Sequence, residues 1–425
     1  MNIPDKLRAI KDALSGRRQE RKRLRGPAPL NYAIADAIGM LDAASWKAMS
    51  ADAGFFMSIE YLAALEQVLP SNLSARYALI YSGEGSERKP VAAVYMQIAD
   101  ISLAQARPEK GADEVKRLDL LAANARQRVL SCGNLLTYGQ HGIAFAQGVD
   151  EKLAWHGVAE VLYRVRRAEK LAGKTHFIMI KDLHAPYTEQ AVHLQSLSYR
   201  YVETEPNMLL TLQDDWKSYD DYLASLASKY RGKVRSGIFK PMDEAACTIE
   251  QVADLSAVQD RVHALYKAVQ SNASFRPFEL RPEYFATLQQ VAGARMRCSA
   301  VMRDNTMLGF LITVADGPTA IAYHIGFDRD AAEDLPIYLR LLHAGVADAI
   351  ALGCKQVSYG RTALEPKAAL GAKPQTFGIL VRHRQPVLNK IIKRILLGVE
   401  HEDAPERSPF KNAPAPKQDK QLETT

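Results

Sequence analysis

One order of predicted elements occurs twice along this chain of 425 residues. In the first half, hydrophobic spacing predicts a helix, a strand pair, a glycine-interrupted strand, a long helix and a strand, at 55–69, 75–83, 89–101, 128–145, 151–174 and 175–183. The second half gives three helical segments, a three-strand meander, a helix and a strand, at 218–237, 251–270, 281–292, 294–304, 307–316, 317–328, 335–354 and 355–361. Such a repeat predicts two similar α/β domains.

The two ends of the chain differ in composition from this body. Residues 1–25 contain nine Lys or Arg and three Asp or Glu, a net charge of +6 out of +7 for the whole chain. The segment beyond about His401 is polar and rich in proline, which predicts disorder. We therefore expect a basic N-terminal arm at 1–29, a first domain at 30–185, a second domain at 186–396 and a disordered Pro-rich tail at 397–425.

Cysteine usage and hydropathy argue against several classes of protein. The four cysteines are far apart and form no CxxC pair, which disfavours a disulfide framework or a zinc ribbon. The N-terminal segment has no apolar stretch typical of a secretion signal, and no run of 18 apolar residues occurs. The sequence therefore predicts a cytoplasmic protein without a metal site.

Four segments of the second half carry a family resemblance. They are YDDYLASLASKYRGKVRSG (219–237), ALYKAVQSNASFRPFELRPEYFATL (264–288), MLGFLITVADGPTAIAYHIGFD (307–328) and LPIYLRLLHAGVADAIALGCKQVSYGRTALEPKAALGAKPQ (335–375). In this order they resemble the second domain of FemAB-like acyltransferases, within the GNAT (GCN5-related N-acetyltransferase) group, and FFMSIEYLAALE (55–66) resembles the opening of the first domain. The resemblance implies two tandem GNAT-like domains, each with a mixed, mainly antiparallel sheet flanked by helices.

The resemblance also implies an activity. The expected reaction moves an acyl group from an activated donor to a primary amine by direct attack, without a covalent enzyme intermediate. Acyl-CoA is the favoured co-substrate, and no tightly bound cofactor is expected. An aminoacyl-tRNA donor in cell-envelope biosynthesis stays open, as does a non-catalytic binding module of an envelope or polysaccharide pathway.

One departure from the GNAT pattern concerns coenzyme A. A glycine-rich turn before the central helix usually cradles the pyrophosphate with backbone N–H groups. Here that place reads AAEDLPIYLR (331–340), where Glu333 and Asp334 would repel a phosphate. The glycine-spaced segment CGNLLTYGQHG (132–142) is a weak alternative phosphate loop.

The end of the strand at 355–361 is the main candidate site. Tyr359, Gly360, Arg361 and Thr362 stand where strand ends of open α/β sheets face ligands, and Lys367 follows shortly after. Arg361 and Lys367 suit a phosphate or a carboxylate, Thr362 is grouped with them, and Gly360 allows close backbone approach. The alternative is an ordinary strand-end turn with solvated charges.

The strand YHIGFD adds two candidates. His324 is a candidate general base near neutral pH, and Tyr323 and Tyr359 are grouped with it as candidate catalytic residues. Because neighbours on a strand point to opposite faces, we expect only one of Tyr323 and His324 to face a cleft. The alternative for His324 is a core histidine, which the sequence favours.

Basic residues on two helices suggest anionic partners. Lys229 with Lys233, and Arg231 with Arg235, form two i,i+4 ridges that favour an anionic ligand, unless they are simply solvated. Residues 381–397 hold five Lys or Arg and no acid, with a possible apolar stripe at Pro386, Leu388, Ile391, Ile392 and Ile395. Expected partners are therefore the acyl donor, an amine acceptor such as an envelope precursor, and the anionic inner face of a membrane, but not DNA.

Overall fold

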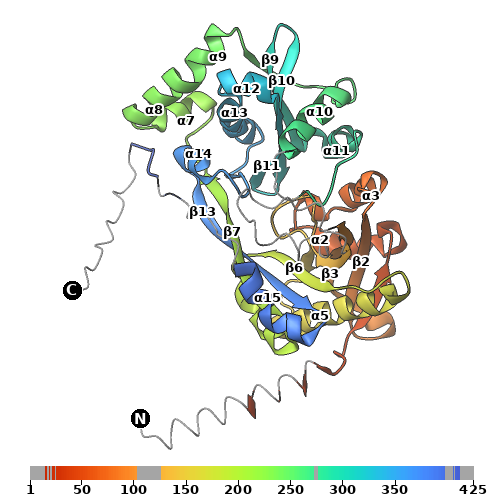
Figure 1. The fold of residues 1–425 in the computed structure, drawn as a ribbon. Coiled ribbons are helices and arrows are strands. Elements are labelled where there is room, and N and C mark those ends of the chain that lie inside the picture. The colour runs from red at the N-terminus through yellow and green to blue at the C-terminus, as the bar shows by residue number, and fades with distance from the viewer. Residues whose placement is uncertain are drawn as a thin grey trace, which may run out of the picture. The chain divides into compact units, whose positions relative to one another are not determined.

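The computed structural model describes residues 15–16, 19, 22–23, 25–102, 126–271, 276–397, 405 and 407–411, and it divides into two compact units (Figure 1). The first unit comprises Met1–Thr204, Ser274–Arg281 and Phe377–Glu400. The second comprises Glu205–Ala273, Pro282–Thr376 and His401–Thr425. Residues 186–204 and 377–396 thus belong to the first unit, whereas the sequence analysis assigned them to the second domain.

The first unit is a mainly antiparallel sheet with helices. Its strands are β1 (Asn31–Ala35), β2 (Leu73–Ser82), β3 (Lys89–Ser102), β4 (Arg126–Cys132), β5 (Ile143–Phe145), β6 (Phe177–Leu183) and most of β13 (Lys373–His383). Its helices are α2 (Ala43–Ser50), α3 (Ile59–Val68), α5 (Glu151–Ala168), α6 (Tyr187–Gln190) and α15 (Pro386–Leu397). The strand order is β1-β2-β3-β4-β6-β13, with β5 beside β3, and β4 and β6 are parallel. The predicted glycine-interrupted strand at 128–145 is therefore two strands, β4 and β5, separated by a loop.

The second unit has the corresponding arrangement. Its strands are β7 (Arg200–Thr211, which begins in the first unit), β8 (Thr248–Gln251), β9 (Met296–Arg303), β10 (Thr306–Asp316), β11 (Thr319–Phe327) and β12 (Gln356–Ser358). Its helices are α7 (Tyr219–Ser225), α8 (Ser228–Val234), α9 (Lys240–Glu244), α10 (Gln259–Gln270), α11 (Tyr284–Ala292), α12 (Arg329–Asp334), α13 (Ile337–Ala351) and α14 (Leu364–Ala369). The order is β8-β9-β10-β11-β12-β7, and β11 and β12 are parallel.

The two units share one topology but exchange their last strands. In each unit, an antiparallel meander leads through a crossover helix, α5 or α13, to a parallel strand, β6 or β12. The strand after β6 in the sequence is β7, which pairs with β12, and the strand after β12 is β13, which pairs with β6. The prediction of two similar α/β domains is confirmed, whereas neither exchanged strand was predicted.

Helices cover both faces of the second unit's sheet. A Cβ atom added to Gly309 on β10 would meet Ile337 of α13 at 2.8 Å, so α13 lies on that face. A Cβ atom on Gly326 of β11 would lie 2.7 Å from backbone atoms of Leu265 and Tyr266, so α10 lies on the other face. Glycine is required at Gly326 because the obstructing atoms belong to the backbone of a helix and cannot rotate away.

The predicted helix at 218–237 is interrupted. A capping box between Ser218 and Asp221 starts α7, and the chain becomes extended at Leu226 before α8 begins. Residues 407–411 fill the break, because Leu226 pairs with Phe410 and the Ala227 N–H donates to the Pro409 carbonyl at 2.8 Å. After α8, residues Arg235–Phe239 form a π-helix.

These contacts correct part of the prediction for the ends of the chain. The tail was expected to be disordered throughout, but Phe410 contacts the ring of Trp216 at 5.4 Å and Arg407 forms an ion pair with Glu365 at 2.7 Å. Other tail residues, and most of the predicted basic arm, lie outside the described residues. Within the described part of the chain, no helix has the length and apolar character needed to cross a membrane.

The close approach of α10 to β11 gives a stability test. We expect Gly326→Ala to lower the free energy of unfolding by about 1–3 kcal/mol, because the new methyl group overlaps the α10 backbone. The matched control is Gly232→Ala on α8, where no atom lies within 4 Å and alanine favours the helix, so stability should stay constant or rise slightly. Urea unfolding of both variants makes the measurement, and equal midpoints would contradict this packing.

Candidate active site

The two parallel strands of the second unit separate partway along β11. Their pairing covers only Thr319–Ile321 with Gln356–Ser358. Beyond this point β11 continues to Phe327, whereas β12 ends and the chain turns at Gly360, whose φ is +70°. The candidate residues on β11 and those after β12 therefore lie on either side of the point where the strands separate.

A β-bulge sits next to this point. Ile312 pairs with His324 and Thr313 pairs with Ala322, so Tyr323 is the extra residue of β11. Bulges redirect side chains and are enriched beside active sites. The ring centroids of Tyr323 and His324 lie 6.5 and 6.0 Å from the ring centroid of Tyr284 on α11, so both side chains pack against the same ring. The expectation that they point to opposite faces is wrong, because the bulge breaks the alternation of the strand.

His324 lies among aromatic rings. Its ring centroid is 4.3 Å from that of Tyr323 and 5.3 Å from that of Phe285, and its Nε2 atom is buried without a hydrogen-bond partner. Burial lowers the pKa of His324 to about 3, so the imidazole is neutral at pH 7 and weakly basic. This environment does not favour the predicted role of a base near neutral pH. The Tyr323 hydroxyl is hydrogen-bonded to the hydroxyl of Tyr284.

The chain after β12 is fixed by Asn207 of β7. Its Oδ1 atom accepts from the Ser358 hydroxyl at 2.9 Å and from the Gly360 N–H at 3.0 Å. The Tyr359 hydroxyl donates to the Leu342 carbonyl of α13 at 2.9 Å. Tyr359 therefore connects the strand end to the crossover helix, an arrangement that favours a positioning role over a catalytic one.

Lys367 binds the loop that follows. The residue is 4% exposed. Its ammonium donates to the carbonyls of Gly360, Arg361 and Thr362 at 3.3, 2.6 and 2.8 Å. Burial lowers the pKa of Lys367 to about 8, although Glu205 opposes this shift. Because all three N–H bonds point at carbonyls, Lys367 holds the loop in place, and this geometry does not favour its predicted role as a direct anion ligand.

The loop itself has an unusual backbone. Thr362 and Ala363 have φ values of +63° and +44°, a conformation that residues other than glycine rarely adopt and that is especially unfavourable for the β-branched Thr362. Strain of this kind persists only where surrounding contacts enforce it, and it is concentrated at functional sites. Thr362 is exposed and Arg361 is half-buried, so both side chains can reach a ligand.

The basic ridges on α8 are only partly available. Arg231 donates to the carbonyls of Ala224 and Leu226 at 3.2 and 3.1 Å and thus caps the end of α7. Lys229, Lys233 and Arg235 are exposed. One of the two predicted ridges therefore remains intact, whereas the other retains Arg235 alone.

In one of the two segments discussed as phosphate turns, backbone N–H groups already have partners, and in the other the exposed side chains are acidic. In the segment 132–142, the Leu135 N–H donates to Gln97 and the Gly139 N–H donates to Asp182, at 2.6 and 2.9 Å. Before α13 the chain forms α12, whose first turn is capped by Asp328, and Glu333 and Asp334 are exposed there. Arg261 forms an ion pair with Asp328 at 3.1 Å. Neither segment presents a ready cradle for a pyrophosphate.

Sequence reasoning missed Asn207 and Tyr284 because each acts through a distant partner. Asn207 lies on the unpredicted strand β7, 153 positions from Gly360. Tyr284 lies in a predicted helix and was interpreted only as part of its apolar pattern. A polar residue inside a strand pattern is the one local signal that could have identified Asn207.

The Lys367 cluster gives a second prediction. Lys367→Met removes the donor from three carbonyls, and we expect the free energy of unfolding to fall by about 2–4 kcal/mol. The control is Lys355→Met, since the Lys355–Asp214 ion pair is exposed and its loss should have no measurable effect. Urea unfolding compares the two, and an unchanged Lys367 variant would show that this cluster does not stabilise the loop.

The His324 site gives a pH prediction. Its pKa is about 3 in the folded protein and about 6.5 in an unfolded chain, so the unfolded state binds an extra proton between these values. The free energy of unfolding therefore falls as the pH falls through this window. In His324→Leu we expect the loss between pH 7 and pH 5 to be smaller by about 2 kcal/mol. Urea unfolding at both pH values measures it, and an identical loss in both proteins would contradict the burial of His324.

Residues 228–368 match the family described as "Acetyltransferase (GNAT) domain". No curated protein matches the chain. Among solved structures, the chain is similar to FemX, with 12% identity, coverage of 79% of this chain and 94% of the other, and a TM-score of 0.48. It is also similar to a tandem GNAT protein from the clavulanic acid biosynthesis pathway (11% identity, coverage 84% and 99%, TM-score 0.46). A third is L-PGS from Bacillus licheniformis (10% identity, coverage 79% and 94%, TM-score 0.43).

The family match covers the elements that build the candidate site. It includes β11 with its bulge, the crossover helix α13, β12 and the loop closed by Lys367. The first unit repeats the same strand order with its own parallel pair. The second unit therefore contains a segment, residues 228–368, that matches a GNAT acetyltransferase domain, and the first unit has the same sheet topology.

Proposed function

We propose that the second unit transfers an acyl group from acyl-CoA to a primary amine. The observation that carries this proposal is the separation of β11 from β12 within the segment that matches the GNAT family. Strands that separate leave room for an extended ligand to run along one of them and to bind its backbone. The pantetheine arm of coenzyme A is extended and contains amide groups, so it suits a position along β11 from His324 to Phe327.

The proposed reaction is a direct attack. The amine nitrogen bonds to the thioester carbonyl carbon, the C–S bond breaks, and the proton lost from nitrogen leaves with the thiol product or with water. Cys132, Cys247, Cys298 and Cys354 are all buried, and burial raises the pKa of each thiol. A buried thiol with a raised pKa is a poor nucleophile, which supports a mechanism without a cysteine intermediate.

Positioning is the main contribution that these residues can make. His324 is too weakly basic to remove a proton efficiently near neutral pH. Holding two reactants in line can supply about 7–11 kcal/mol of the barrier reduction without any proton transfer. The strained loop at Thr362–Ala363, fixed by Lys367, fits such a role because it holds Arg361 and Thr362 at the point of strand separation.

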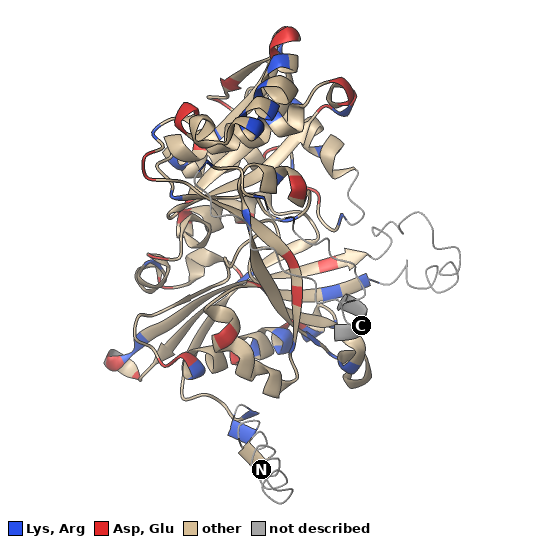
Figure 2. Ribbon diagram, turned by 90° about the vertical axis from the view of Figure 1, so that its left-hand side faces the viewer, with Lys and Arg blue, Asp and Glu red and all other residues tan. Residues whose placement is uncertain are grey.

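The phosphates of the donor need a separate anchor. The short helix α12 is acidic, so we assign the phosphates to the exposed side chains of Lys229, Lys233 and Arg235. The same ridge would suit the backbone of an aminoacyl-tRNA, which is the second candidate donor. In Figure 2, acidic and basic positions are interspersed over the second unit, whereas tRNA binding calls for an extended basic surface, so acyl-CoA is favoured.

Donor binding and turnover test the proposal together. We expect acetyl-CoA to raise the thermal midpoint of the full chain, because a ligand that binds the folded state stabilises it. Arg361→Ala should lower kcat/KM by about tenfold or more through loss of a charge-assisted contact. The double variant Lys229→Ala/Lys233→Ala should raise the Kd for acetyl-CoA while leaving the fold intact. Lys355→Ala is the matched control, since its lysine is exposed elsewhere in the second unit.

Three results would contradict the proposal. A midpoint that rises with charged tRNA but not with any coenzyme A thioester, and that loses this rise at high salt, would select the aminoacyl donor. Unchanged turnover in Arg361→Ala would show that the acyl group does not react at this strand end. A labelled acyl group retained on the protein would show a covalent intermediate and exclude direct attack.

A further inference from the structure

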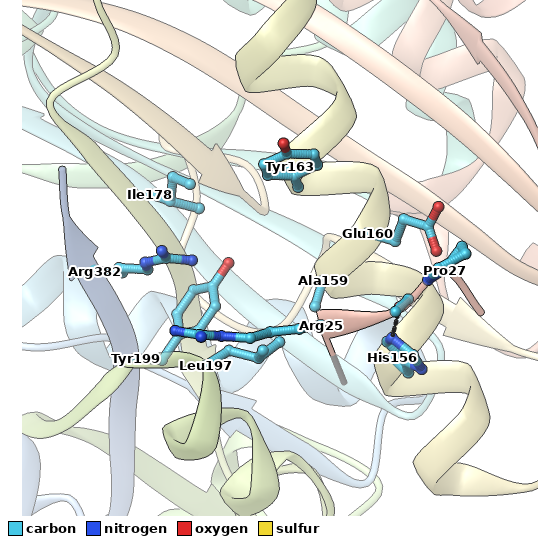
Figure 3. Close-up of a pocket in the computed structure, with 11 residues that line it drawn as sticks. Arg25, Pro27, His156, Ala159, Glu160, Tyr163, Ile178, Leu197, Tyr199 and Arg382 are labelled. Atoms are coloured by element: carbon cyan, nitrogen blue, oxygen red, sulfur yellow. Dashed lines mark hydrogen bonds between the residues drawn. The ribbon is translucent and has the colours of Figure 1, made fainter. Parts of the chain in front are cut away.

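The first unit contains a cavity that the proposed reaction does not use. Its volume is about 490 Å³, and it lies beside α5 (Figure 3). Its lining comes from the segment at 25–27, from α5, from β6, from Leu197 and Tyr199 just before β7, and from β13. The His156 ring is within hydrogen-bond distance, 3.1 Å, of the Gly26 carbonyl and fastens the first of these segments to α5.

The chemistry of the lining suits an anionic amphiphile. Arg25 and Arg382 contribute guanidinium groups from opposite ends of the chain, and Figure 3 shows both extending toward Tyr199. Ile178 and Leu197 add apolar surface. The one carboxylate of the lining, Glu160, accepts hydrogen bonds from the Ala28 N–H, the Tyr32 hydroxyl and Arg164, at 2.8, 2.9 and 2.7 Å. The charge of Glu160 is therefore balanced by these three donors, none of which is Arg25 or Arg382.

Helix α15 is fixed next to this cavity. The side-chain amide of Asn389 donates to the Ser198 carbonyl at 2.9 Å, and its Oδ1 atom accepts from the His383 N–H at 2.7 Å. Ser198 lies between Leu197 and Tyr199, which both line the cavity. Ile392 packs into a small core with Val202 and Val381. The helix therefore has a defined buried side and a defined exposed side.

Three apolar residues of α15 are exposed. Val387, Leu388 and Ile391 are 74%, 38% and 39% exposed, and their spacing places them on one face, which we name the α15 stripe. Arg384 and Lys390 beside it are also exposed, and residues 381–397 contain no acid. The exposed Tyr163 of the cavity lining is similarly accompanied by cations, since Arg166 and Arg167 lie 5.5 and 6.0 Å from its ring.

We propose that the first unit docks on an anionic phospholipid surface through the α15 stripe, and that the Arg25–Arg382 cavity binds the anionic headgroup of a lipid from that surface. A helix with an apolar stripe and flanking cations lies in the interface of such a membrane. Each basic residue near the surface adds electrostatic attraction to the anionic lipids. The two guanidinium groups can pair with a phosphate in a bidentate manner, while Ile178 and Leu197 accept the adjoining carbon chain.

Vesicle sedimentation of the full chain tests this proposal. Vesicles contain phosphatidylcholine alone or with about a third phosphatidylglycerol, at low and high salt, because screening weakens the attraction of exposed charges. We expect at least about tenfold tighter binding to the anionic vesicles, and a loss of this advantage at high salt. Leu388→Ser/Ile391→Ser should weaken binding about tenfold through loss of apolar contact with lipid.

Controls separate the stripe from the cavity. Leu171→Ser is the matched control, because Leu171 is 100% exposed elsewhere in the first unit and should not change binding. Arg382→Gln should weaken binding to anionic vesicles but not the residual binding to phosphatidylcholine. The thermal midpoints of all variants should match that of the parent protein, since the α15 stripe is exposed and Arg382 lies on a cavity wall.

Four outcomes would overturn the proposal. These are equal binding of the parent protein to both kinds of vesicle, unchanged binding of the stripe variant, a loss in Leu171→Ser as large as in the stripe variant, and unchanged binding in Arg382→Gln. A thermal shift with glycerol phosphate that depends on Arg382, without binding to vesicles, would instead identify a site for a free phosphate and exclude membrane docking.

Discussion

Parallel strands cannot be joined by a tight turn, and this constraint organises both units. The chain must cross one face of the sheet between β4 and β6, and again between β11 and β12. Helices α5 and α13 make these crossings, and both are buried against their sheets. In the second unit the strand that follows the crossover, β12, is only three residues long, so β11 extends beyond the end of its parallel neighbour. The separation of these strands, and with it the candidate site, follows from this short return.

The candidate site depends more on backbone than on reactive side chains. Lys367 uses its ammonium on three consecutive carbonyls, and Asn207 binds the Gly360 N–H. These contacts hold Thr362 and Ala363 in a conformation that they would not adopt alone. An acyltransferase that acts by alignment needs a rigid strand end more than a strong base, and the low pKa of His324 agrees with such a mechanism. Helix α12 stands where the usual phosphate turn would come, and its exposed residues Glu333 and Asp334 are acidic.

The two units differ in the features that could bind or act on a ligand. The second unit contains the family segment and the separated strands. In the first unit, β4 ends at Cys132, and the loop that follows directs backbone N–H groups to Gln97 and Asp182. The first unit instead has the cavity with two arginines and the exposed apolar face of α15. The same topology thus carries different side chains in its two copies, and the two proposals made for this protein rest on that difference.

Local spacing and short segments were enough to predict the duplicated order of elements, the meander at 294–328, the crossover helices and the family resemblance. They also located the strand end at Tyr359–Thr362. The exchange of β7 and β13 could be seen only in the folded chain, because a local pattern does not specify which sheet a strand joins. The same holds for Tyr323 and His324, which share a face because of a bulge set by pairing with β10. In the sequence, Lys367 and Arg231 resembled anion ligands. In the structure, each donates hydrogen bonds to backbone carbonyls, which only the folded chain brings within reach.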